Sequence, residues 1–343
     1  MNPRAGAGLN VMVTVAPDED ALLEAARDGD EAAFRGLVEP HYRELHAHCY
    51  RMLASVHDAD DALQDALLRA WRGMPRFQGR SSLRSWLYRI ATNTSLDLIA
   101  HRPTRVLPLD DAPAAERAWV EPYADERLGL EDGHASPHAR FEHRESVELA
   151  FVAALQHLAP NQRAALILRD VMGFSAKESA AALETTVPAV NGALRRARRG
   201  LDGRLPDASQ QTTLRALGDA QLRAVVERYT RALEDGDVDG LLALLTADAA
   251  WSMPPDGAWF RGHAALAEFL RAGPLRVRWR HLPAQANGQP AVGCYAWDEA
   301  RGEFRAAVLD VLSLRGGLIC DVTAFVDPAL FPRFGLPDAL PAR

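Results

Sequence analysis

The sequence contains a single lysine, Lys177, so arginine carries almost all of its permanent positive charge. It also contains few cysteines, and Cys49, Cys294 and Cys320 have neither a CxxC pattern nor the cysteine–histidine spacing of a zinc site. We therefore expect no disulfide framework, no metal and no other cofactor. This cysteine usage is typical of a protein from a reducing compartment.

Long apolar runs are missing as well. The apolar run at residues 9–16 is too short to span a membrane, and it lacks the charged start and cleavage pattern of an export signal. We therefore expect a cytoplasmic protein. The 343 residues predict two or three domains, and a content of 48% apolar and 25% charged residues is typical of folded ones.

The net charge of −7 disfavours nucleic-acid binding when it is taken as an average over the chain. The charge is segregated, however. Residues 69–105 hold eight arginines and one acid, Asp97, whereas residues 106–140 hold three arginines and eight acids. The first block has a net charge of +7 and the second of −5, so the sequence predicts a basic surface next to an acidic segment.

Helical periodicity runs through residues 18–102. The segment DADDALQDALLRAW (58–71) places leucines on one face and crowds aspartates into the first turn, where the helix dipole favours anions. A further helix is predicted from Ser81 or Ser82, which are good caps, to about Ala100.

Two segments lack this periodicity. Prolines punctuate the acidic residues 103–140, which are predicted to form an extended linker. Residues 206–215 (PDASQQTTLR) are predicted as a second, polar linker. The helical pattern resumes between them, over residues 141–205.

A helix-turn-helix is predicted within residues 173–201. Ser175 and Glu178 form a capping box before a short helix, a tight turn follows at residues 184–186, and a second helix begins near Val187. The apolar face expected to pack inward comprises Val187, Val190, Leu194, Ala197 and Leu201. The outward polar face comprises Asn191, Arg195, Arg196 and Arg199. Arginines on such a helix can contact guanine edges or phosphates in the major groove.

An ordinary helical hairpin with a solvated arginine face is the alternative interpretation. The turn lacks the glycine that is common in DNA-binding versions. Gly192 lies inside the second helix, where glycine costs about 1 kcal/mol relative to alanine. It either allows close approach to DNA or has no role.

Aromatic residues are interleaved with arginines in RFQGRSSLRSWLYRIATNTSLDL (76–98). Rings such as Phe77 and Tyr88 can stack on unpaired bases while arginines hold the backbone, so the segment suits a melted DNA strand. The alternative is that the aromatics belong to the core. Trp86 lies on the apolar face of its helix and is expected there, Tyr88 less so.

Taken together, these segments resemble a bacterial sigma factor of the sigma-70 family, in its extracytoplasmic-function group. The helix at 58–71 resembles the region-2 helix that docks on core RNA polymerase, and residues 77–98 resemble the helix that captures the melted −10 element. QHLAPNQRAALILRDVMGFSAKESAAAL with the following helix resembles the region-4 motif that reads the −35 element. The resemblance spans residues 20–205 and implies two all-α domains, at 18–102 and 141–205.

The resemblance also implies partners and contacts. Core RNA polymerase and promoter DNA are the expected partners. Residues expected to face the polymerase are Asp61, Gln64, Asp65 and Leu68. Residues expected at the −10 strand are Arg80, Arg84, Tyr88, Arg89 and Asn93. Residues expected at the −35 duplex are Lys177, Asn191, Arg195, Arg196 and Arg199.

The pattern changes class after the second linker. Helices are predicted at about 219–234, 237–246 and 263–271, and strands at 249–253, 275–282, 290–298, 304–314 and 317–326. Gly316-Gly317 is a strong hairpin signal between the last two strands. The pattern predicts an α+β domain with a curved antiparallel sheet over residues 216–337.

This tail resembles the SnoaL-like, nuclear transport factor 2-like cone fold in two stretches, WSMPPDGAWFRGHAALAEFL (251–270) and DVTAFVDPALFPRFGLP (321–337). Cone folds often enclose an apolar pocket. Residues expected to line one are Trp251, Met253, Trp259, Phe260, His281, Trp297 and Asp310. An anti-sigma factor or a small-molecule ligand is a candidate partner of this domain, and no membrane is expected.

Asp310 shares its predicted strand face with Ala306, Val308 and Leu312, so an acid interrupts an apolar face. Catalytic acids look like this, but so do acids that keep an edge strand soluble. The favoured interpretation is that the aromatics are core and that the domain regulates or docks, without catalysis.

Three functions compete. A sigma factor gives core polymerase promoter-specific transcription, and truncation after Leu205 would keep core binding but change promoter activity. A ligand-sensing one-component regulator binds operator duplex without polymerase. An enzyme with a helical appendage shows turnover by residues 215–343 alone, abolished by Asp310→Asn. The sequence favours the sigma factor, because a one-component regulator needs no polymerase-docking helix.

Overall fold

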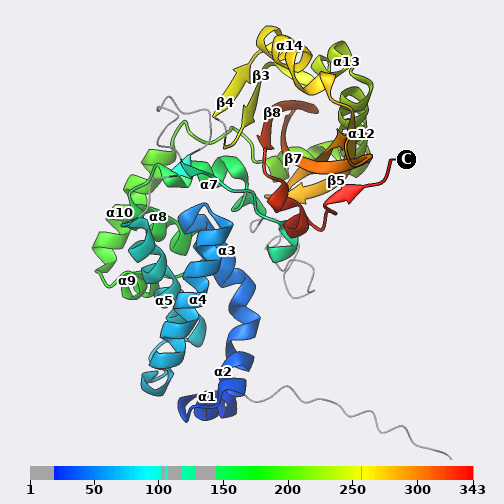
Figure 1. The fold of residues 1–343 in the computed structure, drawn as a ribbon. Coiled ribbons are helices and arrows are strands. Elements are labelled where there is room, and N and C mark those ends of the chain that lie inside the picture. Colours follow the sequence, from blue (N-terminus) through cyan, green and yellow to red (C-terminus); the bar gives the residue numbers. More distant parts are fainter. Residues whose placement is uncertain (1–18, 102–104, 107–117, 129–143, 256, 343) are drawn as a thin grey trace, which may run out of the picture.

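The computed structural model describes residues 19–101, 105–106, 118–128, 144–255 and 257–342. Within these ranges, helices form the N-terminal part of the chain and a curved sheet with covering helices forms the C-terminal part (Figure 1). This confirms the predicted fold class of two all-α units followed by an α+β domain. No described helix is both long enough and apolar enough to cross a membrane.

The first helical unit comprises α1 (Glu19–Arg27), α2 (Glu31–Val38), α3 (Tyr42–Leu53), α4 (Val56–Gly73) and α5 (Leu83–Ile99). Helix α5 begins after Ser82, whose hydroxyl accepts a hydrogen bond from the Ser85 amide at 3.2 Å, as predicted. Helix α4 begins earlier than its aspartates indicate, because the Ser55 hydroxyl caps it by accepting from the Asp58 amide at 3.0 Å. Trp86 is buried, as expected of a core residue.

The second helical unit comprises α7 (Leu149–Gln156), α8 (Pro160–Leu166), a π-helical turn (Ile167–Val171), α9 (Ala176–Ala182) and α10 (Val187–Leu201). The predicted capping box of Ser175 and Glu178 is present, with bonds of 3.2 and 2.8 Å. Val187 belongs to the face predicted to pack inward but does not pack, because it is the first residue of α10 and precedes the buried turns of that helix. Val187 is exposed, while the other four members of that face are buried.

Part of the predicted acidic linker is packed rather than extended. The short strands β1 (Arg105–Val106) and β2 (Ala118–Trp119) pair in parallel, and Val120 and Tyr123 have no exposed surface. The Glu121 carboxylate accepts from the Ser55 hydroxyl and the Val56 amide at 2.8 and 2.9 Å, at the start of α4. The acidic composition of the segment gave no indication of these buried and hydrogen-bonded residues. The other residues of that prediction, 103–104, 107–117 and 129–140, lie outside the described ranges.

The tail domain begins inside the second predicted linker. Helices of the tail domain are α11 (Gln210–Leu217), α12 (Asp219–Asp235), α13 (Val238–Leu242) and α14 (His263–Ala272). Its strands are β3 (Leu245–Met253), β4 (Ala258–Arg261), β5 (Trp279–Ala286), β6 (Gln289–Asp298), β7 (Glu303–Arg315), β8 (Leu318–Phe325) and β9 (Ala339–Leu340). Helix α11 forms in the polar segment because the Ser209 hydroxyl caps it, accepting from the Thr212 amide at 3.1 Å.

The strand order of the large sheet is β4-β3-β8-β7-β6-β5, with β9 added to β7. The prediction of a wholly antiparallel sheet is wrong at one pairing, because β3 and β8 run parallel. Helix α14 carries the chain back so that β5 runs in the direction of β4, and three hairpins then bring β8 alongside β3. The hairpin predicted at Gly316-Gly317 is confirmed, with positive φ at both glycines.

Three elements of the tail domain differ from the prediction by four residues, and one of them is β3, which was expected to begin at residue 249 and begins at Leu245. The strand expected at 275–282 is shifted to Trp279–Ala286, because Pro274–Arg276 forms a 3₁₀ turn first. The helix expected to end at 246 ends at Leu242, because β3 begins at Leu245.

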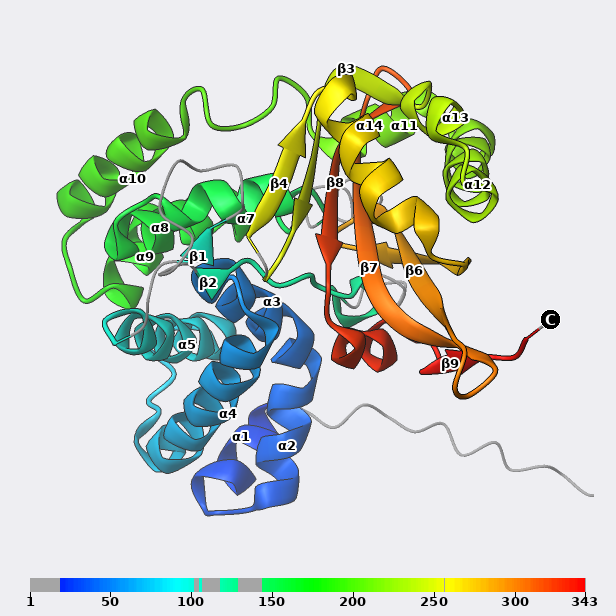
Figure 2. The ribbon, with the colours of Figure 1, turned by 45° about the horizontal axis from the view of Figure 1, so that its top comes forward.

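The two faces of the sheet belong to different cores. One face packs against α12, α13 and α14 around Tyr229, Trp251 and Leu266. The other face packs against the C-terminal 3₁₀ segment Pro328–Phe334, and this core is continuous with that of the helical units. Figure 2 shows the sheet between α12 and the blue helices of the first unit. The tail domain is therefore built onto the helical units rather than tethered beside them.

A buried hairpin tip joins the tail domain to both helical units. Asn287, at the turn between β5 and β6, has no exposed surface. Its Nδ2 donates to the Tyr50 hydroxyl at 2.8 Å and to the Val147 carbonyl at 2.6 Å, and its Oδ1 accepts from the Tyr123 amide at 2.8 Å. One side chain thus bonds to α3, to the second helical unit and to the described part of the linker.

We predict that Asn287→Asp lowers the free energy of unfolding by about 3 kcal/mol, because a carboxylate oxygen would replace the buried donor that faces two acceptors. The urea midpoint measured by circular dichroism checks this. Asn161→Asp is the matched control, because Asn161 is exposed in the first turn of α8, where a negative charge is favourable. Equal midpoints for both variants would contradict a structural role of the hairpin tip.

Candidate polymerase- and promoter-binding surfaces

The predicted polymerase contacts form one stripe along α4. Asp61, Gln64, Asp65 and Leu68 recur at helical spacing, and all four are wholly or partly exposed. Leu68 is 48% exposed, which is unusual for a leucine in this chain. Arg69 donates to Asp65 and to Asp97 of α5 at 2.8 Å each, so the stripe is held next to α5. An exposed leucine on this stripe is suited to protein docking, because the cores of protein interfaces are apolar.

The predicted −35 contacts lie on the open face of the helix-turn-helix. Asn191, Arg195, Arg196 and Arg199 are exposed along α10, and Lys177 is exposed on α9. The opposite face of α10 is buried through Val190, Leu194, Ala197 and Leu201. Helix α10 therefore presents a continuous basic surface on a rigid support. Arg198 differs from its neighbours, because it donates to Asp170 at 2.9 and 2.7 Å.

The predicted −10 contacts are divided between exposed and buried positions. Arg80 is exposed before α5, and Arg89 and Asn93 are partly exposed along it. The Asn93 amide reaches Glu184 of the second helical unit at 3.5 Å. Tyr88, in contrast, has no exposed surface, although the sequence predicted that it would be less buried than Trp86.

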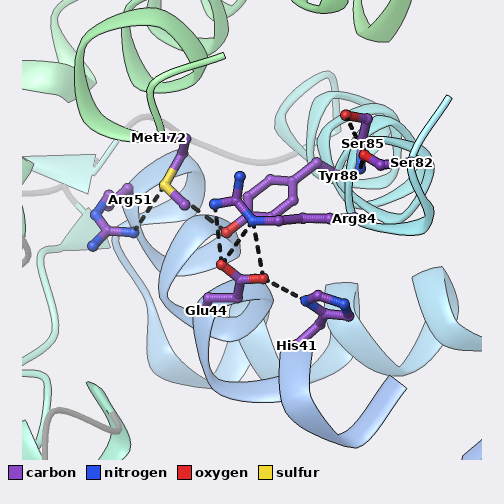
Figure 3. A network of polar contacts seen from close by, with 8 residues as sticks. All are labelled: His41, Glu44, Arg51, Ser82, Arg84, Ser85, Tyr88 and Met172. Atoms are coloured by element: carbon purple, nitrogen blue, oxygen red, sulfur yellow. Dashed lines mark hydrogen bonds and ion pairs between the residues drawn. The ribbon is translucent and has the colours of Figure 1, made fainter. Parts of the chain in front are cut away.

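Arg84 lies at the centre of a contact between the two helical units (Figure 3). Its Nε and Nη2 donate to the Glu44 carboxylate of α3 at 3.1 to 3.2 Å. Its guanidinium lies 4.9 Å from the ring centroids of both Tyr88 and Phe174. The guanidinium is thus covered by an aromatic ring from each unit, which is a favourable cation–π arrangement.

The Glu44 carboxylate is held in its charged form. Burial raises the pKa of this carboxyl, but hydrogen bonds from His41 and Arg84 outweigh burial, so the pKa lies below its ordinary value. The His41 Nδ1 lies 2.6 Å from the Glu44 Oε1. Both carboxylate oxygens are therefore used, and Arg84 is kept against α3.

Met172 closes the same contact from the second helical unit (Figure 3). Its sulfur accepts from the Tyr88 hydroxyl at 3.9 Å and from the Arg51 Nη1 at 4.0 Å. Arg51 is fully buried and also donates to the Ser146 hydroxyl at 2.7 Å. We call the set Glu44, Arg84, Tyr88, Met172 and Phe174 the closed contact.

Of the residues predicted to line a pocket in the tail domain, four gather in one packed core and the other three lie apart from it. Trp251 and Asp310 are buried in the core under α12, with Met253 and Phe260 packed against it. The His281 Nδ1 lies 3.0 Å from Glu234 of α12. Trp297 lies on the opposite face of the sheet, against Phe304, and Trp259 is 45% exposed on the edge strand β4.

Asp310 is part of a buried polar cluster. Its Oδ2 accepts from the Tyr229 hydroxyl at 2.8 Å and from the Cys294 thiol at 3.3 Å. Burial raises its pKa to about 6, against these two hydrogen bonds. The edge-strand explanation is wrong, because β7 lies between β6 and β8. Ala306 does not share its face either, because a bulge shifts the register of β6 and β7 between residues 306 and 308.

Comparison with known proteins assigns this arrangement to a family. Residues 37–103 match the model of Sigma-70 region 2, residues 148–201 that of Sigma-70, region 4, and residues 226–322 that of the SnoaL-like domain. The chain is 42% identical over 346 residues to the ECF RNA polymerase sigma factor SigG of Mycobacterium tuberculosis, covering 94% of this chain and 90% of that protein. The chain belongs to the ECF RNA polymerase sigma factors.

Other relatives of this sigma factor agree with the assignment. The ECF RNA polymerase sigma factor SigM of Mycobacterium tuberculosis is 33% identical over 181 residues, covering 52% of this chain and 81% of that protein. The crystal structure of the extracytoplasmic function sigma factor SigJ of Mycobacterium tuberculosis shares the fold at a TM-score of 0.57 and 23% identity, covering 86% of this chain and 97% of that one. The predicted resemblance is confirmed.

Three members of the closed contact in this sigma factor were not singled out from the sequence: Glu44, Met172 and Phe174. Phe174 directly precedes the capping residue Ser175, a position whose apolar side chain often packs on the fourth residue of its own helix. That residue is Ser179, which offers no apolar partner. A phenylalanine without an apolar partner in its own helix therefore indicated packing on another unit. The position of Glu44, in contrast, could be known only from the fold.

Two glycines of α10 give a matched pair of predictions. A Cβ at Gly192 would meet the mobile end of Arg196 at 3.4 Å, whereas a Cβ at Gly200 would meet the Leu158 Cδ2 at 2.8 Å. We expect Gly192→Ala to raise the free energy of unfolding by about 1 kcal/mol and Gly200→Ala to lower it by about 1 to 2 kcal/mol through overpacking. Urea unfolding measures both, and a shift of the same sign for the two variants would contradict the close packing of α10 against Leu158, just before α8.

Proposed function

We propose that this sigma factor docks on core RNA polymerase in the cytoplasm through the α4 stripe and reads the −35 duplex through α10. The observation that carries the proposal is the exposed basic face of α10, with Asn191, Arg195, Arg196 and Arg199, above a buried apolar face. The stripe with Leu68 on α4 is a separate exposed surface. A one-component regulator would need α10 but not this stripe.

Transcription with purified core polymerase tests the proposal. We expect promoter-specific transcripts from the full chain, and at least a tenfold fall for Arg195→Ala with Arg196→Ala, because two guanidinium contacts to the duplex are lost. Leu68→Asp should instead weaken association with core polymerase. The matched control is Arg198→Ala, because Arg198 is paired with Asp170. An equal loss for the control, or no association of the full chain with core, would contradict the proposal.

We further propose that the closed contact is an inactive arrangement for the −10 strand. Tyr88 has no exposed surface, and Arg84 lies between Tyr88 and Phe174. A base cannot stack on a ring that is already covered, so the second helical unit must leave α5 before these two residues bind a melted strand. Arg163 opposes this separation, because it is buried and donates to carbonyls of both units, Met52 and Leu155.

Reversible crosslinking tests this separation. The Ser85 hydroxyl and the Glu178 carboxylate lie 3.4 Å apart across the units, so cysteines at both positions can be joined by a bis-maleimide that contains a reducible disulfide. With Cys320→Ser as background, we expect at least tenfold less promoter opening after crosslinking and recovery after reduction. The uncrosslinked double variant controls for loss of the capping box. Unchanged opening in the crosslinked protein would refute the proposal.

The tail domain is proposed to regulate the opening of the closed contact rather than to catalyse a reaction. Support comes from the Asn287 tip, which bonds to both helical units, and from Asp310, whose Oδ2 already accepts two internal hydrogen bonds. An anti-sigma factor that covered α5 would also keep α5 from binding a melted strand. A small molecule on the tail domain would act through the hairpin tip.

A further inference from the structure

A cavity of about 620 Å³ lies where the second helical unit meets the segment that leads to the tail domain. Its walls come from α7, from the π-helical turn Ile167–Val171, from the last turn of α10 and from residues 202–209. This volume is within the range of small-molecule sites in proteins. None of the residues predicted to line a pocket in the tail domain lines this cavity.

The backbone around the cavity explains why the chain leaves space there. The π-helical turn is closed by the Met172 amide bonding to the Ile167 carbonyl at 2.9 Å, five residues back. Such a turn widens the helix and pushes residues outward, and π-helical turns occur often at functional sites. After α10, Asp202 leaves the helical conformation with φ −57° and ψ 124°, and Gly203 has a φ of +74°, so the helix ends and the chain turns beside the cavity.

The lining combines an apolar floor with acidic walls. Phe151, Val171 and Leu205 are apolar and partly or wholly exposed. Among the residues that the structure describes, four carboxylates line the cavity, Glu145, Glu148, Asp170 and Asp202, against one cation, Arg198. Since Arg198 pairs with Asp170 at 2.7 Å, three carboxylates are left without a cationic partner in the lining.

Glu148 is the most buried of these three carboxylates. Its oxygens accept from the backbone amides of Gln210 and Gln211, at 3.0 and 2.8 Å, at the start of α11. Burial raises the pKa of this carboxyl to about 7, although both amide bonds oppose the rise. A positive charge in the cavity would favour its ionised form.

We propose that this cavity binds a small organic cation with an apolar body, of the amine or amidine class. The hydrocarbon part lies on Phe151, Val171 and Leu205, and the cationic group faces Glu145, Glu148 and Asp202. The site touches the −35-reading helix through Leu201 and the tail domain through the Glu148 cap of α11. A bound cation would therefore contact both α10 and the start of the tail domain. The binding itself does not depend on the proposed promoter contacts.

A charge series on one hydrocarbon tests the proposal with the full chain. The probes are 4-phenylbutylamine, 4-phenylbutanol and 4-phenylbutyrate, titrated by isothermal calorimetry at pH 7.5. We expect saturable binding of the amine at one site, at least tenfold weaker binding of the alcohol, and none of the acid. Equal binding of all three probes, or none by the amine at millimolar concentration, would overturn the proposal. Tighter binding of an arginine-containing peptide than of the amine would assign the cavity to a protein partner and also overturn it.

Variants locate the binding site. Glu145→Gln with Asp202→Asn should weaken amine binding at least tenfold, and Ala150→Trp should abolish it by filling the cavity. Asp207→Asn is the matched control, because Asp207 is an exposed acid of the same connector outside the lining. Loss of amine binding in the control, or retention in both cavity variants, would refute the location. The test leaves transcription aside, so its failure is distinct from failure of the proposed sigma function.

Discussion

One buried asparagine side chain holds the parts of this sigma factor together. Asn287 is at the tip of a tail-domain hairpin, yet its bonds go to α3, to the linker and to the second helical unit. Its positive φ and the following glycine shape a turn that enters the junction without steric conflict. Because these groups have no exposed surface, withdrawing the tip would leave buried donors and acceptors unsatisfied, so the seated tip stabilises the relative placement of the helical units.

The closed contact depends on that placement. Arg84 is stabilised there by a carboxylate from its own unit and by a ring from the other. A guanidinium between two rings loses little by leaving water, since it is weakly hydrated and remains paired with Glu44. The same chemistry suits a DNA base and a phosphate. The closed contact therefore uses the same types of interaction, ring stacking and a charge-assisted bond, that the −10 face is proposed to make with a DNA strand.

Most elements were predictable from the sequence because their signals are local. The Ser82 cap, the Ser175–Glu178 capping box and the Gly316-Gly317 hairpin each depend on a few neighbouring residues. The burial of Tyr88 was not predictable, because its partner Met172 is distant in the chain. The linker failed for a similar reason, since Tyr123 finds its partners at His46 and Asn287. The acidic composition of the linker predicted an extended segment, whereas contacts with residues distant in the chain bury Tyr123.

The two proposed DNA-reading faces differ in accessibility within one conformation. The basic face of α10 is exposed, whereas Tyr88 on α5 is covered. On the proposed roles, the free sigma factor can sample intact duplex but has little affinity for unpaired strands. Cells contain unpaired DNA at every replication fork, and a permanently open −10 face would sequester the protein there. On the same proposed roles, coverage by the second helical unit would keep the protein available for promoters.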